Sequence, residues 1–164
     1  MKQYLIFILA LMALGLSACA QMENKSYVFP SSKATYPITK TDAEWKKLLT
    51  PQQYYITREK GTDPGFSGPY WNNHEKGIYN CIACGEPLFS SETKFESGTG
   101  WPSFFKPIND KAVKTFTDAS TGSTRTEVVC SRCGAHLGHI FNDGPQPTGL
   151  RYCLDGSALN FVKK

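Results

Sequence analysis

The spacing of hydrophobic residues changes twice along the chain. Near the start, an apolar run of 13 residues extends from Tyr4 to Leu16 without a charge. Further on, Trp45, Leu48 and Leu49 are spaced as on one face of a helix. From Gly61 onward, short hydrophobic runs alternate with Gly, Pro, Asn and Asp, as in strands joined by turns. The pattern predicts small helices followed by a mainly β, mostly antiparallel domain.

Two helix starts are marked by capping residues. Thr41 is followed three residues later by Glu44, which is the spacing of a capping box. Thr50 is followed by Pro51 at the first helical position and by Gln53 three residues after the cap. We therefore expect one short helix after Thr41 and a second after Thr50.

The β-type runs are short and separated by turn residues. None of them repeats at a fixed period, apart from two similar cysteine pairs described below. They are GIYNC (77–81), PLFSS (87–91), TKFES (93–97), VKTFTD (113–118), TEVVC (126–130), GHIF (138–141) and RYCLDGSALNF (151–161).

The first residues have the order of an export signal. Lys2 precedes the apolar run, which is too short to span a bilayer as a helix, and small residues follow it. The tetrapeptide ending at Cys19, LSAC, resembles the bacterial lipobox, in which cleavage leaves a lipid-bearing cysteine. The alternative is an ordinary signal peptide with an incidental cysteine. We predict a lipoprotein signal peptide at 1–18, lipidation of Cys19, a tether at 19–40 and one domain at 41–164.

The composition agrees with one folded domain and excludes one class of partner. Of 164 residues, 13% are aromatic and 20% are charged, so a folded core is expected. The formal net charge is +4, and the basic residues do not form a cluster. We therefore expect no nucleic-acid partner.

Four cysteines form two matched pairs. Cys81 and Cys84, and again Cys130 and Cys133, are C-x2-C pairs followed by glycine. Two such pairs supply the four ligands of a closed tetrahedral zinc site, with 45 residues between them. Disulfides in an oxidising compartment, or one redox-active pair, are the alternatives.

A fifth cysteine has no such companion. In an extended strand, Arg151 and Cys153 place their side chains on the same face, and a nearby cation raises the thiolate fraction. His136 and His139 continue the three-residue spacing of the second cysteine pair, but four cysteines already fill a tetrahedral site. The residues thus indicate a nucleophilic thiol with an acid–base partner, with a packing role as the alternative for His136.

Three motifs make the chemistry more specific. The stretch SGTGWPSF (97–104), the stretch CGAHLGHIFNDGPQPTGLRYC (133–153) and the two C-x2-C pairs resemble the B-type peptide methionine sulfoxide reductases. The resemblance extends from about Thr41 to Phe161. It implies a fold of two antiparallel sheets with small helices and the reduction of the R epimer of methionine sulfoxide.

The resemblance also implies a role for each matching residue. Cys153 attacks the sulfoxide sulfur and becomes a sulfenic acid, while His139, with His136 beside it, donates a proton to the oxygen. Arg151 helps to hold the thiolate. Trp101 packs against the substrate methyl group, and Phe104 extends that wall. The structural zinc is held by Cys81, Cys84, Cys130 and Cys133.

Two positions depart from the pattern of many relatives. Thr99 stands where many have a cysteine that closes a disulfide with the nucleophile, so we expect an external, thioredoxin-like dithiol as reductant. Asp155 stands where relatives usually have asparagine; we assign it to the catalytic group. Its carboxylate disfavours a nearby thiolate unless it is protonated, pairs with Arg151 or points away.

The sequence thus predicts an exported, lipid-anchored enzyme that repairs oxidised proteins of the cell envelope. A zinc-knuckle binding module leaves Cys153, His139 and the GWPSF stretch unexplained. A thiol–disulfide oxidoreductase using one C-x2-C pair is the second alternative.

Overall fold

The structure is a computed structural model that describes residues 34–164. The predicted signal peptide, the predicted lipidation site at Cys19 and most of the predicted tether lie outside these residues. Among residues 34–164, no helix combines the length and the apolar composition that a membrane crossing requires.

Two short helices begin where the capping residues predict them. Helix α1 (Asp42–Leu48) follows Thr41 and helix α2 (Pro51–Glu59) follows Thr50, and both caps form complete capping boxes. These caps satisfy backbone N–H groups that would otherwise have no partner in the first turn. Trp45 of α1 is buried, and the Arg58 guanidinium of α2 lies 4.9 Å from the centre of its ring. The two predicted helices are confirmed.

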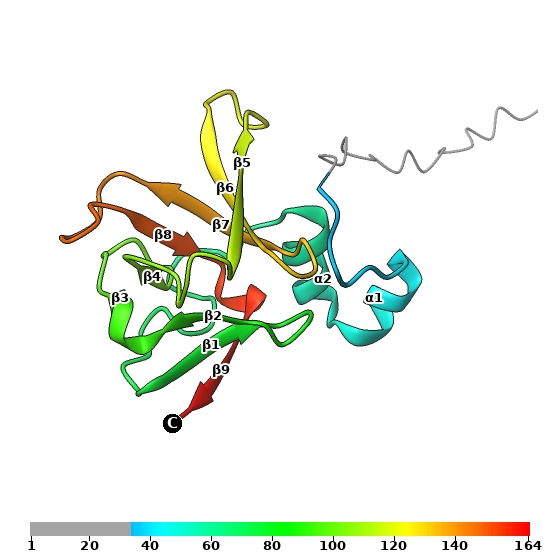
Figure 1. Ribbon diagram of the computed structural model, residues 1–164, viewed down its shortest axis with the longest axis horizontal. Helices are drawn as coiled ribbons and strands as arrows, with labels where there is room; N and C mark the ends of the chain where they lie inside the picture. The colour runs from blue at the N-terminus through cyan, green and yellow to red at the C-terminus, as the bar shows by residue number, and fades with distance from the viewer. Residues whose placement is uncertain (1–33) are drawn as a thin grey trace, which may run out of the picture. The chain divides into compact units, whose positions relative to one another are not determined.

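The smaller sheet has three antiparallel strands. It contains β1 (Gly77–Cys81), β2 (Pro87–Ser90) and β9 (Leu159–Lys163) in the order β2-β1-β9. Figure 1 shows β9 and the C-terminus beside β1, although some 80 residues separate them along the chain. The end of the chain is therefore tied into the domain.

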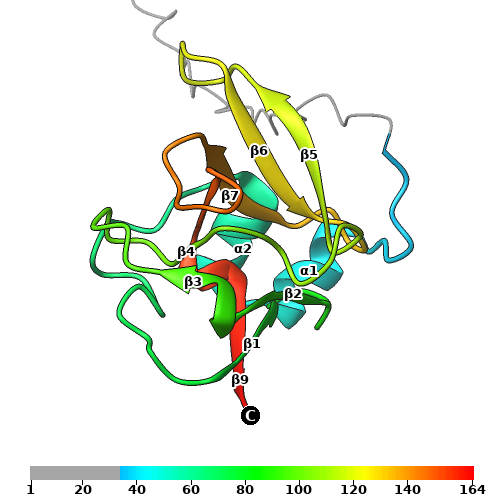
Figure 2. The same cartoon turned by 60° about the vertical axis from the view of Figure 1, so that its left-hand side comes forward.

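The larger sheet has six strands in the order β3-β4-β8-β7-β6-β5. Two short 3₁₀ turns, η1 (Ser91–Thr93) and η2 (Gly156–Ala158), precede β3 and β9. Figure 2 shows the β5–β6 hairpin extending away from the smaller sheet. The strands are β3 (Lys94–Phe95), β4 (Ser103–Phe104), β5 (Val113–Asp118), β6 (Arg125–Cys130), β7 (His136–Phe141) and β8 (Arg151–Leu154). The prediction of a mainly β fold with two antiparallel sheets and two small helices is confirmed.

A buried aromatic cluster joins the two sheets. Phe104 of β4 lies 5.0 Å from Tyr79 of β1 and 4.8 Å from Phe89 of β2, measured between ring centres. All three side chains are completely buried. Because each ring removes a large apolar area from water, this cluster fixes the larger sheet against the smaller one.

Residues at the end of the predicted tether contact the domain. The backbone N–H of Ile38 donates to the Arg132 carbonyl at 2.9 Å, and the Lys114 ammonium lies 4.9 Å from the centre of the Tyr36 ring. The described chain thus packs on the domain before Thr41. The boundaries at 18 and 40 stay predictions.

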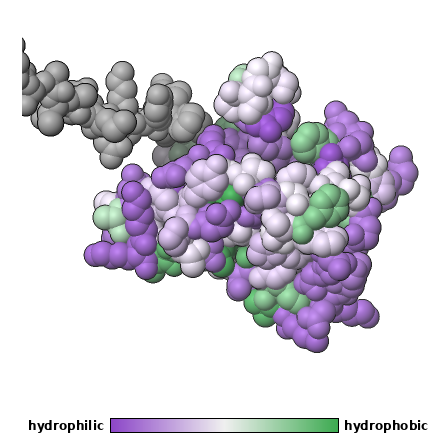
Figure 3. Space-filling model, turned by 180° about the vertical axis from the view of Figure 1, so that it is seen from behind, coloured by the Kyte–Doolittle hydropathy of each residue, from purple (hydrophilic) through white to green (hydrophobic). Residues whose placement is uncertain are grey.

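Exposed hydrophobic residues are distributed over several elements. On the face drawn in Figure 3, hydrophobic patches are small and separated by hydrophilic residues. The large exposed hydrophobic residues of the described chain are Leu48, Tyr55, Phe66, Ile108 and Val162.

Candidate active site and metal centre

The four paired cysteines stand at the ends of two strands and in the turns that follow. Cys81 ends β1 and Cys130 ends β6. The glycines after the second cysteines, Gly85 and Gly134, have φ angles of 75° and 68°. Each donates its N–H to the carbonyl of the first cysteine of its pair, at 2.8 Å and 2.9 Å. Glycine is favoured here because this left-handed turn penalises a Cβ.

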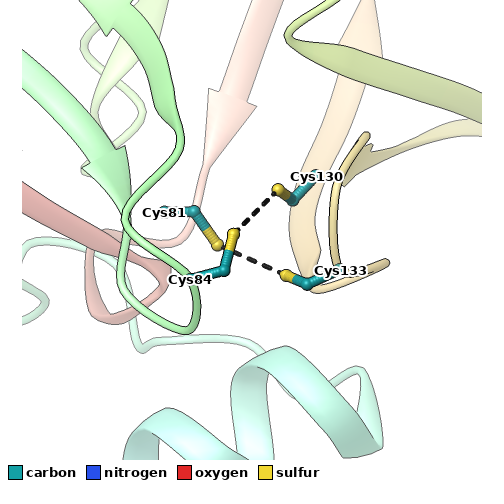
Figure 4. A group of neighbouring side chains, drawn as sticks. All are labelled: Cys81, Cys84, Cys130 and Cys133. Atoms are coloured by element: carbon teal, nitrogen blue, oxygen red, sulfur yellow. Dashed lines mark hydrogen bonds between the residues drawn. The ribbon is translucent and has the colours of Figure 1, made fainter. Parts of the chain in front are cut away.

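The four sulfur atoms form a compact group that fits a metal ion. All four lie within 4.8 Å of one another. Figure 4 shows them converging from the two turns, with Cys81 3.7 Å from Cys133 and Cys84 3.5 Å from Cys130. Tetrahedral zinc with sulfur ligands at about 2.3 Å requires sulfur atoms about 3.8 Å apart, whereas a disulfide requires about 2.05 Å. The spacing therefore fits four ligands of one ion and does not fit two disulfides.

Cys153 lies in the middle of the larger sheet. In the strand register it stands directly opposite His139 of β7 on one side and Ser103 of β4 on the other. Directly paired residues point to the same face of a sheet. Glu127 of β6 is opposite His139 and extends the same row. The sheet thus places a thiol, an imidazole and a carboxylate side by side.

A bulge in β7 brings the two histidines together. Residues three positions apart in a regular strand point to opposite faces. Here Val128 pairs with Gly138 and Val129 with His136, so Leu137 is an additional residue. Gly138 has a φ of 144°, and a Cβ there would clash with the Cys153 carbonyl oxygen. As a result the ring centres of His136 and His139 are 5.4 Å apart.

His139 is held by a carboxylate from the neighbouring hairpin. Its Nε2 lies 2.8 Å from Asp118 Oδ2 at the end of β5, and Arg125 donates to the same oxygen at 2.8 Å. Burial opposes ionisation of Asp118, but hydrogen bonds from Ser120, His139 and Arg125 outweigh it and lower its pKa. An ionised carboxylate only accepts, so Nε2 carries a proton and Nδ1 is left for proton exchange. Burial lowers the pKa of His139, which favours the neutral ring.

His136 belongs to a buried chain of ionisable groups. Its Nδ1 lies 2.7 Å from Glu127 Oε1, and Lys60 donates to Glu127 Oε2 at 2.7 Å. Burial opposes ionisation of Glu127, yet these two contacts outweigh it and lower its pKa. On the other side, His136 Nε2 lies 3.9 Å from Asp155 Oδ2. His136 is thus a buried residue beside His139 that is hydrogen-bonded to Glu127 through Nδ1.

The Cys153 thiol is mainly protonated at rest. Burial raises the pKa of this thiol, and the negative charge of Asp155 raises it further. The Arg151 charge and a hydrogen bond from Thr99 lower the pKa but do not outweigh burial. Arg151 also forms a bidentate pair with Asp143, at 2.8 Å and 2.9 Å. The Arg151 charge acts in the direction that the sequence predicts but does not outweigh burial, so a base is still needed to take the thiol proton.

Asp155 does not pair with Arg151. Its carboxyl is buried and accepts the N–H of Asp63 at 2.7 Å. Burial raises the pKa of Asp155 to about 7, so its charge changes near neutral pH. Of the three possibilities that the sequence left open, the structure favours a carboxyl that is partly protonated at neutral pH.

The two predicted substrate residues differ in position. Trp101 is half-buried, and its indole N–H donates to the Asp63 carbonyl at 2.9 Å. Phe104, which we predicted to extend the substrate wall, is completely buried in the aromatic cluster. It alternates with Ser103 along β4 and points away from the row that contains Cys153. This corrects the prediction: Phe104 supports the site from within the core.

Several supporting residues were not identified from the sequence. Asp118 resembled an ordinary turn residue, and Asp63 lies in a loop rich in Gly and Pro. Glu127 offered a signal, because a charged residue directly preceding the buried run Val128–Cys130 requires a partner.

Most of the chain is similar in sequence to known proteins. A family model described as the SelR domain matches residues 49–163. The chain is 56% identical over 129 residues to the peptide methionine sulfoxide reductase MsrB of Leptospira interrogans, covering 79% of this chain and 98% of that protein. The MsrB of Agrobacterium fabrum is 56% identical over 124 residues, covering 76% and 92%, and that of Thiobacillus denitrificans is 57% identical over 125 residues, covering 76% and 95%.

Proposed function

The chain belongs to the SelR-domain family of MsrB peptide methionine sulfoxide reductases, and on that premise we propose how its residues reduce methionine (R)-sulfoxide. The observation that carries the proposal is the row formed by Ser103, Cys153 and His139 across three strands. It combines a half-buried thiol with an imidazole whose far nitrogen is bound to Asp118. That arrangement is a nucleophile, a base and a group that orients the base.

In the first step, His139 moves the proton that the reaction requires. Neutral His139 accepts the thiol proton of Cys153 at Nδ1, and the Cys153 sulfur attacks the sulfoxide sulfur. The resulting imidazolium gives this proton to the sulfoxide oxygen. The oxygen is transferred to Cys153, which is oxidised by two electrons to a sulfenic acid, while the substrate sulfur is reduced to methionine. General acid–base help of this kind contributes about 10²–10⁴-fold.

Selection of one epimer follows from the placement of different groups around the chiral sulfur. The indole of Trp101 offers an apolar surface for the methyl group, and His139 offers a proton for the oxygen. In the S epimer, oxygen and methyl exchange places, which sets a polar oxygen against the indole without a donor.

The sulfenic acid requires a reductant from outside the domain. The residues that hydrogen-bond to Cys153 are Thr99 and Arg151, and neither is a cysteine. The other cysteines among residues 34–164 belong to the four-sulfur cluster. A thioredoxin-like dithiol therefore reduces the sulfenic acid to the thiol, releasing water and leaving the reductant as a disulfide.

The four-cysteine cluster is proposed to hold structural zinc. Cys81, Cys84, Cys130 and Cys133 fill all four positions of a tetrahedral ion, which leaves no position for a substrate. When bound, the ion fixes the end of β1 to the end of β6 and stabilises the fold. The chemistry stays at Cys153.

The location of the enzyme is proposed from the first residues. The lipobox-like sequence before Cys19 supports export and a lipid anchor, and hence repair of oxidised cell-envelope proteins. Mass spectrometry of the protein purified from membranes tests this. A mature chain that begins with lipid-modified Cys19 is expected, and a chain that keeps residues 1–18 contradicts it.

The activity is tested with the two separated epimers of a peptide methionine sulfoxide and dithiothreitol as reductant. We expect turnover of the R epimer and at least about 10²-fold slower turnover of the S epimer. Dimedone should trap a sulfenic acid on Cys153 when the reductant is omitted. An intramolecular disulfide to Cys153 after one turnover would contradict the external reductant, and preference for the S epimer would contradict the proposed reaction.

A further inference from the structure

Asp63 lies outside the catalytic row, at the point where its own loop meets helix α2 and the turn after β8. It belongs to the loop between α2 and β1, and it is 3% exposed. The loop packs closely on the turn after β8: a Cβ at Gly156 would clash with the Pro69 carbonyl oxygen. A buried acidic residue needs several hydrogen bonds to offset its loss of water.

The backbone of Asp63 contacts two residues of the site directly. Its carbonyl oxygen accepts the indole N–H of Trp101 at 2.9 Å, and its own N–H donates to Asp155 Oδ1 at 2.7 Å. One peptide segment therefore orients both the indole and the carboxyl two residues after Cys153. A shift of this segment moves both groups.

The side chain of Asp63 fixes that segment in place. Oδ2 accepts the backbone N–H of Ser157 at 2.8 Å, and Oδ1 accepts the Ser157 hydroxyl at 2.7 Å. Gln52 of α2 donates to the same Oδ1 at 3.0 Å. The carboxylate thus connects the loop to helix α2 and to η2, which follows the strand that carries Cys153.

We propose that Asp63 is a positioning residue that fixes Trp101 against the substrate and holds the carboxyl of Asp155 beside the nucleophile. This rests on the proposed reductase function for its effect on turnover. Asp63 itself acts through these two residues and takes no part in proton or oxygen transfer. Loss of its side chain releases the loop, whereas an isosteric amide preserves the contacts.

The contrast between Asp63→Ala and Asp63→Asn is the main test. Asparagine can accept the Ser157 N–H with its oxygen and donate to the Ser157 hydroxyl and to a flipped Gln52 amide. We expect Asp63→Ala to lower kcat/KM for the R epimer by roughly 10–100-fold, mostly through KM. Asp63→Asn is expected to stay within about threefold of the wild type.

A second readout is independent of turnover. The Trp101 indole N–H, assigned by its absence in Trp101→Phe, should exchange with solvent at least about tenfold faster in Asp63→Ala and unchanged in Asp63→Asn. Thr93→Ala is the matched control, because buried Thr93 also joins two segments, through the Ser90 and Lys106 carbonyls. It should leave the indole exchange unchanged.

The charge of Asp63 provides a third readout. Asp155 faces His136 of β7 and Asp63 of the loop, and it follows β8, the strand that carries Cys153 and Arg151. Burial is the main cause of the raised pKa of Asp155, and the Asp63 charge adds to it, while the Asp63 N–H and His136 act in the opposite direction. In Asp63→Asn, the inflection that Asp155 adds to the pH–rate profile should therefore move to lower pH.

These measurements distinguish failure of the positioning role of Asp63 from failure of the proposed reductase function. Loss of activity in Asp63→Ala with unchanged indole exchange overturns the positioning role, as does an equal loss in Asp63→Asn. If Asp63→Ala does not fold, Ser157→Ala removes one of the same hydrogen bonds and should raise KM and indole exchange by roughly threefold. Wild-type protein that does not reduce the R epimer refutes the proposed function, while the indole measurement still tests the positioning.

Discussion

Two groups of cysteines in this domain have the same reactive atom and opposite surroundings. The four cluster sulfurs are surrounded mainly by one another, within 4.8 Å. Cys153 faces His139 and Ser103 across the sheet and is in contact with Arg151 and Thr99. In the cluster, each thiol has sulfur partners that suit a metal; at Cys153, the partners are groups that exchange protons. The neighbours, not the cysteine, decide which chemistry is available.

The difference also extends to how each group is supported. The cluster is held by two tight turns that the sequence repeats, CxxCG. The Cys153 site is held by long-range pairs, from Asp118 to His139 and from Lys60 through Glu127 to His136. Each half of the metal site is a local turn motif, whereas the proton-transfer site depends throughout on contacts between distant segments.

The largest expected effect comes from exchanging cysteine for serine in each group. Cys84 and Cys153 are both half-buried, so they form a matched pair. Cys153→Ser should lower kcat by at least about 10⁴-fold, because a hydroxyl is a far weaker nucleophile than a thiol and is a poor oxygen acceptor. Metal content, measured by atomic emission, should remain about one ion per chain.

Cys84→Ser should give the reverse result. Loss of one ligand should release the metal and lower the midpoint of thermal unfolding sharply, because metal binding contributes directly to folding free energy. Activity per folded molecule should stay near the wild-type value. Retained activity in Cys153→Ser would refute the assignment of the two groups.

A smaller loss should follow from removing the base or its partner. His139→Gln should lower kcat by about 10²–10⁴-fold. Asp118→Asn should lower it by roughly 10–10²-fold, because the amide no longer holds the proton on Nε2. The control is Asp110→Asn, an aspartate of the exposed loop between β4 and β5. Equal activity of Asp118→Asn and Asp110→Asn at every pH would show that Asp118 does not act through His139.

The carboxyl of Asp155 should make the folded state less stable as the pH rises towards neutral. Burial raises its pKa to about 7, against about 4 in the unfolded chain. Between these values the folded state keeps a proton that the unfolded state has lost, so stability falls as pH rises from 4 to 7. Asp155→Asn removes this cost and should be more stable than the wild type by up to roughly 4 kcal/mol at pH 8, with little difference near pH 4.

Urea unfolding at several pH values measures this difference. Asp118→Asn is the control, because the folded-state pKa of Asp118 is lowered and its effect on stability should therefore change with pH in the opposite direction. Its carboxylate stabilises the fold above its unfolded pKa, and that contribution is lost as pH falls through the folded pKa. A constant difference between Asp155→Asn and the wild type from pH 4 to 8 would show that the carboxyl does not titrate there.

The sequence predicts well what depends on neighbours in the chain. Thr41 and Thr50 begin helices because the cap and its partner are three residues apart, and the glycines after the cysteine pairs mark tight turns. It does not predict what depends on the register between distant strands. The pairing of Cys153 with Ser103, the bulge at Leu137 and the buried position of Phe104 all follow from the assembled sheet. For the same reason Asp63, Asp118 and Glu127 were not identified as supporting residues.

The smallest expected effect concerns Thr99, at the position where we expect a cysteine in many relatives. The Thr99 hydroxyl hydrogen-bonds to Cys153 and acts to lower the pKa of that thiol, against burial. Thr99→Val keeps the shape and removes the hydroxyl, so the thiolate loses one donor. The net value of such a bond is about 0.5–1.5 kcal/mol, or roughly two- to tenfold in thiolate population.

The rate of Cys153 alkylation against pH measures that population directly. In Thr99→Val the curve should move to higher pH and reach the same maximum, because the intrinsic reactivity of the thiolate is unchanged. Thr93→Val is the control, since Thr93 contacts Ser90 and Lys106 and has no bond to Cys153. A curve for Thr99→Val that coincides with the wild type would mean that Cys153 depends on Arg151 and His139 alone. In that case Thr99 would contribute shape alone at this position.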